Sequence, residues 1–246
     1  FFEPARSAII PSLVTKKDLV TANALSGSTW SVMLAFGAAL GGVIVYLFGI
    51  KVAFILDAST FILSAWFLSK IPSQKKSTKK DSSKHTGYQE LLDAMRFLMA
   101  EPMVLVLSLL KAGLAVAGGI MTLIPLMASQ VLSVSLSLGI GILYSARGLG
   151  AALGPILVKR IFGETASVLQ WAIAGAFFLK AFSYIFIAYS HNIWTLSLGV
   201  AFATLFGSII WVFSSALIHL SAPDHYLGRV FSFELALLTL VMGLSN

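Results

Sequence analysis

Long apolar runs separated by short polar segments make up most of the chain. A run of about 20 apolar residues is long enough, as an α-helix, to cross the hydrocarbon core of a bilayer. The pattern therefore predicts an all-α, polytopic transmembrane helical bundle with six spans, followed by a loop at residues 223–229 and the start of a seventh span near Val230. The six predicted spans are residues 24–48, 52–71, 102–127, 138–158, 166–189 and 193–221.

The most polar interior segment is the loop from Lys70 to Lys84, which holds six lysines and one acidic residue, Asp81. Lys and Arg resist translocation, so a loop of this kind stays on the cytoplasmic side. This assignment orients every other span. It puts 13 of the 17 Lys and Arg residues in inner segments, one, Lys51, in an outer turn, and three within spans.

Single residues predict where the spans begin and break. Residues 1–22 are mixed in character and predict a loop with a short surface helix, and Thr21 or Asn23 is a candidate N-cap for the first span. Gly49 interrupts the apolar run between the first two spans. Residues 88–99 predict an amphipathic helix that is too short to span and lies on the inner membrane surface.

Composition agrees with a lipid environment and excludes several classes of function. Hydrophobic residues make up 58% of the chain and charged residues 11%, against about 25% charged in soluble domains. The net charge of +7 does not indicate nucleic-acid binding, because the basic residues lie in loops between apolar spans and not on one soluble face. The absence of cysteine excludes disulfides and cysteine-based metal sites, and we expect no cofactor.

Three cations fall inside predicted spans, namely Lys111, Arg147 and Lys180. A charge at the centre of a membrane helix costs about 2.5–3.5 kcal/mol on insertion scales, so such residues are candidates for substrate or ion handling in an aqueous cavity. The alternative is a structural pairing, with Asp57, with Glu234 or with a helix carbonyl. The sequence leaves both open.

Polar and aromatic residues recur on one face of the span 193–221. Thr204, Ser208, Trp211, Ser215 and His219 follow one another at spacings of 4, 3, 4 and 4, which puts them on one helical face. The stripe lines a water-filled cavity or forms a tight helix–helix seam. Trp211 and His219 are large for a seam, so a cavity lining is favoured.

Three titratable groups are candidate proton carriers: Asp57, Glu234 and His219. Asp57 lies only about 9 Å from the start of its span, which favours a cap or an ion pair. Glu234 follows Arg229 closely, so the same alternative applies to it. His219 lies near the inner end of its span and is expected to be hydrated.

Glycine pairs predict close helix contacts. Gly37 and Gly41 form a G-x-x-x-G pair, which lets another helix backbone approach. The pentapeptide GAALG at 37–41 recurs at Gly150 to Gly154, as an internal repeat or as a coincidence in Gly- and Ala-rich spans. Neither copy fits a dinucleotide-binding loop, because the spacing is wrong and a membrane helix, not a strand, precedes it.

Five segments carry a family resemblance: PARSAIIPSLVTKKDLVTANAL (Pro4 to Leu25), GAALGG (Gly37 to Gly42), AFILDASTFILSA (Ala53 to Ala65), ARGLGAALGP (Ala146 to Pro155) and PDHYLGRVFS (Pro223 to Ser232). With them the chain resembles the major facilitator superfamily, in its branch of macrolide-efflux and enterobactin-exporter-like permeases. The resemblance implies that residues 1–71 end the N-terminal six-helix half, residues 72–101 are the cytoplasmic linker with the amphipathic helix, and residues 102–246 are an incomplete C-terminal half. We therefore expect a piece of a longer protein, with helices five to eleven present and the other helices of the transporter as partners.

The function implied by the resemblance is secondary active export of a small amphiphilic, drug- or siderophore-like molecule by alternating access, coupled to protons, across a bacterial inner membrane. The exporters' motif G-x-x-x-G-P-x-x-G-G maps onto Met33 to Gly42, where Gly37, Gly41 and Gly42 match. Met33 and Ala38 replace its first Gly and its Pro, and losing the Pro removes a kink and weakens the implication of proton antiport. The alternatives are an importer on the same fold, a non-transporting membrane enzyme or scaffold, and the membrane part of an ATP-driven pump.

Overall fold

The computed structural model describes residues 10, 14–70, 95–116, 123, 126–127, 129 and 136–245. The Lys-rich loop beyond Lys70, most of the predicted amphipathic helix and the far end of the span 102–127 lie outside the described residues. Within the described residues the chain is all-helical, which confirms the predicted fold class. The elements are η1 (Lys16–Asp18), α2 (Leu19–Ser69), α4 (Pro102–Val116), α7 (Leu136–Phe162), α8 (Ala166–Ala188), α9 (Ile193–Ser221) and α10 (Asp224–Ser245).

Five helices of the described part are long and apolar enough to cross a membrane. They are α2, over Leu19–Phe67, together with α7, α8, α9 and α10. The fifteen residues of α4 are apolar and cover the first part of the predicted span 102–127. Within the described residues, the apolar runs are therefore helical at the predicted places.

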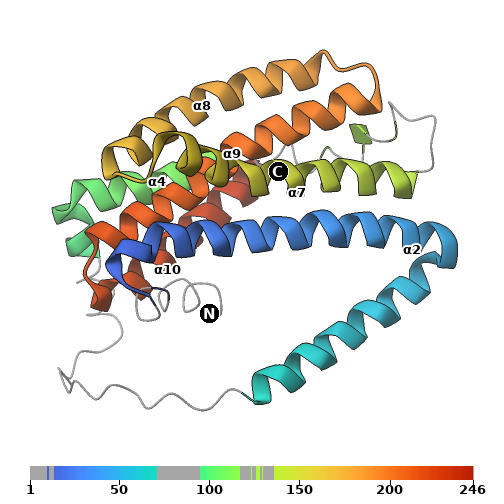
Figure 1. Ribbon diagram of the computed structural model, residues 1–246, viewed down its shortest axis with the longest axis horizontal. Helices are drawn as coiled ribbons and strands as arrows, with labels where there is room; N and C mark the ends of the chain where they lie inside the picture. The colour runs from blue at the N-terminus through green and yellow to red at the C-terminus, as the bar shows by residue number, and fades with distance from the viewer. Residues whose placement is uncertain are drawn as a thin grey trace.

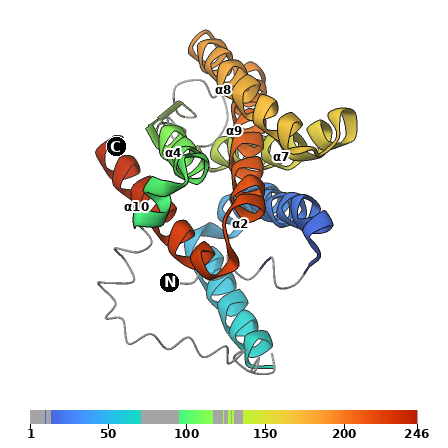
Figure 2. The ribbon, with the colours of Figure 1, turned by 90° about the vertical axis from the view of Figure 1, so that its left-hand side faces the viewer.

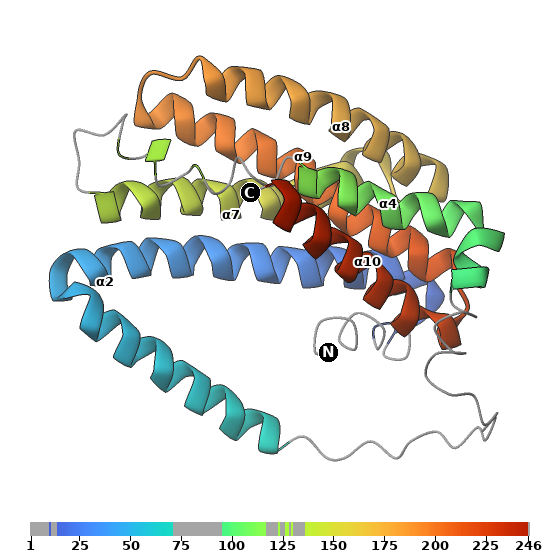
Figure 3. The same cartoon turned by 180° about the vertical axis from the view of Figure 1, so that it is seen from behind.

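A kink at Gly49 divides α2 into the two predicted spans. Gly49 has φ 77° and ψ 168°, a backbone conformation that only glycine adopts without strain. Beyond it, residues 50–69 run back at an angle and diverge from the other helices (Figure 1, Figure 3). Residues 54–67 are all exposed, and Asp57 is among them.

Two helix starts differ from the prediction. The first turn of α2 begins at Leu19, so the prediction that Thr21 or Asn23 caps this helix was wrong. Asn23 instead donates its side-chain amide to the Leu19 carbonyl at 2.8 Å. The helix α10 begins at Asp224, so the predicted loop at 223–229 is helical at all but its first residue. Both errors arose because a polar residue near a helix end was read as lying outside the helix.

The central element is α9. It packs against α7, α8, α4 and α2, while α10 packs mainly on α4 and α2 lies along α7 (Figure 2). We call the end of the bundle where α7 finishes the Lys159 end and the opposite one, where α2 turns, the Gly49 end. Phe213, Ile210 and Leu217 of α9 are completely or almost completely buried in the larger of two apolar clusters.

The two GAALG segments have different surroundings. A Cβ on Gly150 would lie 2.7 Å from Thr204 Oγ1, and one on Gly154 would lie 2.5 Å from Ser208 Oγ, so both glycines let α7 approach α9. Gly37 and Gly41 have no described atom within 4 Å of such a Cβ. Within the described part of the chain, the contact predicted for this pair is absent.

The close approach of α2 to α7 is made by other glycines. Gly42 lies against the Gly141 backbone, where a Cβ would come within 3.2 Å of Gly141 Cα. Gly148 lies against Ala35, with a Cβ only 2.5 Å from the Ala35 nitrogen. Among the predicted packing residues of α2, Gly42 therefore makes the contact.

Candidate functional site

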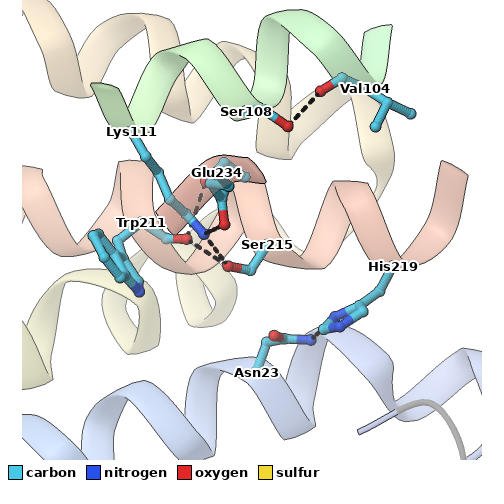
Figure 4. Close-up of polar contacts among 9 residues, drawn as sticks. Asn23, Val104, Ser108, Lys111, Trp211, Ser215, His219 and Glu234 are labelled. Atoms are coloured by element: carbon cyan, nitrogen blue, oxygen red, sulfur yellow. Dashed lines mark hydrogen bonds and ion pairs between the residues drawn. The ribbon is translucent and has the colours of Figure 1, made fainter. Parts of the chain in front are cut away.

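A buried ion pair joins three helices in the Lys159 half of the bundle. Lys111 Nζ of α4 lies 2.8 Å from Glu234 Oε2 of α10, and the two side chains are 3% and 6% exposed. Lys111 also donates to Ser215 Oγ of α9 at 2.7 Å (Figure 4). Measured along the helices at about 1.5 Å per residue, Lys111 and Glu234 are each about 14–15 Å from the first residue of their helix. The pair therefore lies at membrane depth.

Aromatic rings surround the ammonium of this ion pair. Lys111 Nζ is 4.8 Å from the centroid of the Trp211 ring and 5.6 Å from that of Phe231, distances that permit cation–π attraction. The Ser215 hydroxyl in turn donates a hydrogen bond to the Trp211 carbonyl at 3.1 Å. Trp211 is 44% exposed, so it is the most accessible residue of this group.

One oxygen of the ion pair is unsatisfied. Glu234 Oε1 is buried and has no hydrogen-bond partner among the described residues. A buried ion pair is favourable only where its remaining lone pairs are also satisfied. Among the described residues, Oε1 is therefore the atom of this ion pair whose hydrogen-bonding capacity is unused.

A second buried contact joins α2 to α9. Asn23 Nδ2 lies 2.9 Å from His219 Nδ1, and both residues are buried. An amide nitrogen only donates, so Nδ1 of His219 accepts this bond. The His219 ring also packs on Phe231, with centroids 4.9 Å apart. His219 is thus enclosed by protein, and the expectation that it is hydrated was wrong.

The other two membrane cations lie apart from this pair, between α7, α8 and α9. Lys180 Nζ of α8 donates to the Ala203 carbonyl at 3.0 Å and lies 5.3 Å from the Tyr184 ring centroid. The Arg147 guanidinium of α7 is 5.6 Å from the Tyr144 ring centroid, and Gly150, three residues further along α7, packs on the Ala201 carbonyl of α9. Neither cation has a carboxylate partner within the described residues.

The predicted stripe on α9 divides into two parts. Trp211, Ser215 and His219 belong to the ion-pair site and its surroundings. Thr204 and Ser208 donate to carbonyls of their own helix and face the glycines of α7, so they form a seam. The seam reading therefore holds for Thr204 and Ser208, and the cavity lining by Trp211, Ser215 and His219 stays a prediction.

Asp57 is exposed on the diverging half of α2 and pairs with no cation among the described residues. Sequence reasoning missed Phe231 and Tyr184, since an aromatic residue in an apolar span carries no signal of its own. Asn23 was noticed only as a cap, although a polar residue at the start of an apolar run was the available signal.

Comparison with known proteins gives one match. Residues 1–245 match the protein family described as Major Facilitator Superfamily. No curated protein and no solved structure matches the chain. The match covers almost the entire length, including the helices that carry the ion pair.

Proposed function

We propose a function for this chain from one premise: it belongs to the Major Facilitator Superfamily. It is accordingly a multi-pass membrane transporter of small molecules and not an enzyme. Within that family we propose secondary active export of a small amphiphilic molecule by alternating access, driven by a proton gradient. The observation that carries this proposal is the buried Lys111–Glu234 pair with its unsatisfied oxygen.

The ion pair suits a role in coupling because one proton changes how three helices are held together. A proton on Oε1 neutralises the Glu234 carboxylate and removes most of its attraction for Lys111. Lys111 then keeps Ser215 and the Trp211 ring, both on α9, while α10 loses its charged contact with α4. A local change of charge that alters helix packing is a recurrent basis for switching between two states.

Trp211 supports an amphiphilic substrate. Its indole is 44% exposed beside a buried charged pair, so apolar surface and polar groups meet at one place. Ligand sites of transporters and enzymes combine a mostly apolar lining with a few polar groups in this way. In this proposal Lys111, Trp211, Ser215 and His219 line or gate the cavity, Arg147 and Lys180 line it further along, and Ser208 belongs to the seam.

The organisation of the chain follows from the same proposal. Residues 1–71 belong to one half, residues 72–101 form a cytoplasmic linker, and residues 102–246 belong to the other half. With that linker in the cytoplasm of a bacterial cell, the Lys159 end faces inward. Asn23–His219 then joins the two halves near the inner face and must separate when the cavity opens inward.

The test is gradient-driven export of a fluorescent amphiphile by cells that express the complete transporter, with the dye supplied either as uncharged N-phenyl-1-naphthylamine or as its sulfonated relative 8-anilinonaphthalene-1-sulfonate. We expect export that a protonophore abolishes and that Glu234→Gln reduces to background, because the amide imitates the protonated carboxyl and cannot cycle. Glu101→Gln is the matched control, since Glu101 is an exposed acid at the start of α4. The proposal fails if export continues with the protonophore, as in an ATP-driven pump, if the dyes are taken up instead, or if neither dye shows protein-dependent flux.

A further inference from the structure

The structure divides the three membrane cations into one that is neutralised and two that have no counter-charge among the described residues. Lys111 is paired with Glu234 at 2.8 Å. Five of the ten acidic residues have described side chains, namely Asp18, Asp57, Glu101, Glu164 and Glu234, and none of them pairs with Arg147 or Lys180. Lys180 bonds the Ala203 carbonyl of α9, and Gly150, three residues beyond Arg147, packs on the Ala201 carbonyl of the same helix. This layer of the bundle therefore holds two positive charges and, among the described residues, no negative one.

These two cations lie too deep to reach water from a helix end. Arg147 is about 17 Å along α7 from Leu136 and about 22 Å from Phe162. Lys180 is about 21 Å along α8 from Ala166 and about 12 Å from Ala188. A long side chain at the very end of a helix can bring its charge to the interface, but these positions are well inside the membrane.

Hydrogen bonding within the described residues leaves most of their donors unused. An ammonium has three N–H donors and a guanidinium has five. Lys180 uses one of them, on the Ala203 carbonyl, and Arg147 donates to no described acceptor. The remaining N–H groups, together with the Tyr184 hydroxyl, match the oxygens of a carboxylate, sulfonate or phosphate.

The neighbouring backbone leaves room at Lys180. Gly207 of α9 has no side chain, and a Cβ at that position would lie 2.8 Å from Lys180 Nζ. The ammonium therefore occupies the space that any larger residue would fill. Gly150 and Gly154 make room for a neighbouring helix, whereas Gly207 makes room for the Lys180 ammonium.

From these contacts we propose that Arg147, Lys180 and Tyr184 form a subsite for an anionic group, so that the transported amphiphile is an organic anion. The inference rests on the proposed function, because it names the substrate class of the same transporter. An anion bound there would supply the negative charge that Glu234 supplies to Lys111.

The experiment compares two dyes that differ by one sulfonate, binding to the full chain in lipid nanodiscs without any ion gradient. The probes are 8-anilinonaphthalene-1-sulfonate and its uncharged parent N-phenyl-1-naphthylamine, each corrected for empty nanodiscs. Arg147→Gln or Lys180→Gln should weaken binding of the sulfonate about tenfold to a hundredfold, as expected for a lost charge-assisted hydrogen bond, and leave the uncharged dye within about twofold.

Control variants separate charge from folding. Arg147→Lys and Lys180→Arg should retain most of the sulfonate affinity, and Arg160→Gln, at an exposed cation, should change nothing. Gly207→Ala keeps both charges but displaces the ammonium, so it should weaken the sulfonate alone. The proposal is overturned if the neutral variants leave sulfonate binding unchanged, or if both dyes weaken in parallel.

A second arm identifies the source of the anion. If a lipid phosphate also fits the subsite, phosphatidylglycerol added to phosphatidylcholine nanodiscs should lower the sulfonate affinity of the unmodified chain more than that of the Arg147 and Lys180 variants. If only soluble anions fit, the lipid should change the affinity of the unmodified chain and of the variants equally. An anionic subsite exists in either case. The binding assay needs no gradient. It can therefore succeed while proton-driven export fails, or fail while export succeeds, so the two proposals are tested apart.

Discussion

Removing one partner of the Lys111–Glu234 pair should destabilise the bundle far more than removing both. The perturbations are Lys111→Met, Glu234→Leu and the double variant. Each single change leaves one buried charge facing an apolar side chain between α4, α9 and α10. The double change leaves apolar groups of similar size in the same space.

The expected magnitudes follow from burial. Breaking a buried pair by removing one partner costs about 3–5 kcal/mol, whereas replacing both partners with apolar residues is often neutral or stabilising. The two side chains here are 3% and 6% exposed, so the full penalty should apply to each single variant. We therefore expect each single variant to lose about 3–5 kcal/mol and the double variant to be more stable than either.

The assay is reversible unfolding of the purified chain in mixed micelles as the denaturing detergent is increased, followed by helical circular dichroism. The matched control is the pair Lys159–Glu164, which has the same 2.8 Å separation but side chains 31% and 42% exposed. Lys159→Met and Glu164→Gln should each cost less than about 1 kcal/mol, because water and ions screen this pair. Purely additive effects at Lys111 and Glu234, or single losses as small as those of the control pair, would refute the reasoning.

Three further predictions concern packing and orientation. Gly154→Ala should cost about 1–3 kcal/mol in the same unfolding assay, because the added Cβ would collide with α9. Gly41→Ala should stay within about 0.5 kcal/mol, because no described atom lies within 4 Å of its Cβ. Equal losses would contradict the assigned contacts. Asn23→Leu should lose about 0.6 kcal/mol, and no more than about 1.7 kcal/mol, the range measured for hydrogen bonds between membrane helices; a larger loss would mean that Asn23 does more than bond His219. A cysteine at Arg160 should react with a membrane-impermeant maleimide from the same side as one in the Lys-rich loop, and a cysteine at Tyr189 from the opposite side; any other pattern contradicts the proposed orientation.

The sequence by itself determined the features that depend on local physical chemistry, namely which segments are helical and where a helix breaks. The apolar runs specified helices because backbone groups in hydrocarbon must be hydrogen-bonded within their own segment. Gly49 specified the break in α2, since its positive φ depends on that residue alone. Helix ends were predicted less well, as at Leu19 and Asp224, because a polar residue near an end fits on either side of the boundary.

Only the tertiary structure decided which residues meet. Lys111 and Glu234 are 123 positions apart, and nothing in the pattern around either distinguished this pairing from one with Asp57 or with a carbonyl. The same pentapeptide, GAALG, packs tightly on α9 at Gly150 and Gly154, yet no described atom lies within 4 Å of a Cβ at Gly37 or Gly41. Hydropathy and glycine content are properties of one segment. A neutralised charge or a close backbone contact is a property of two segments, and it forms only when the helices pack together.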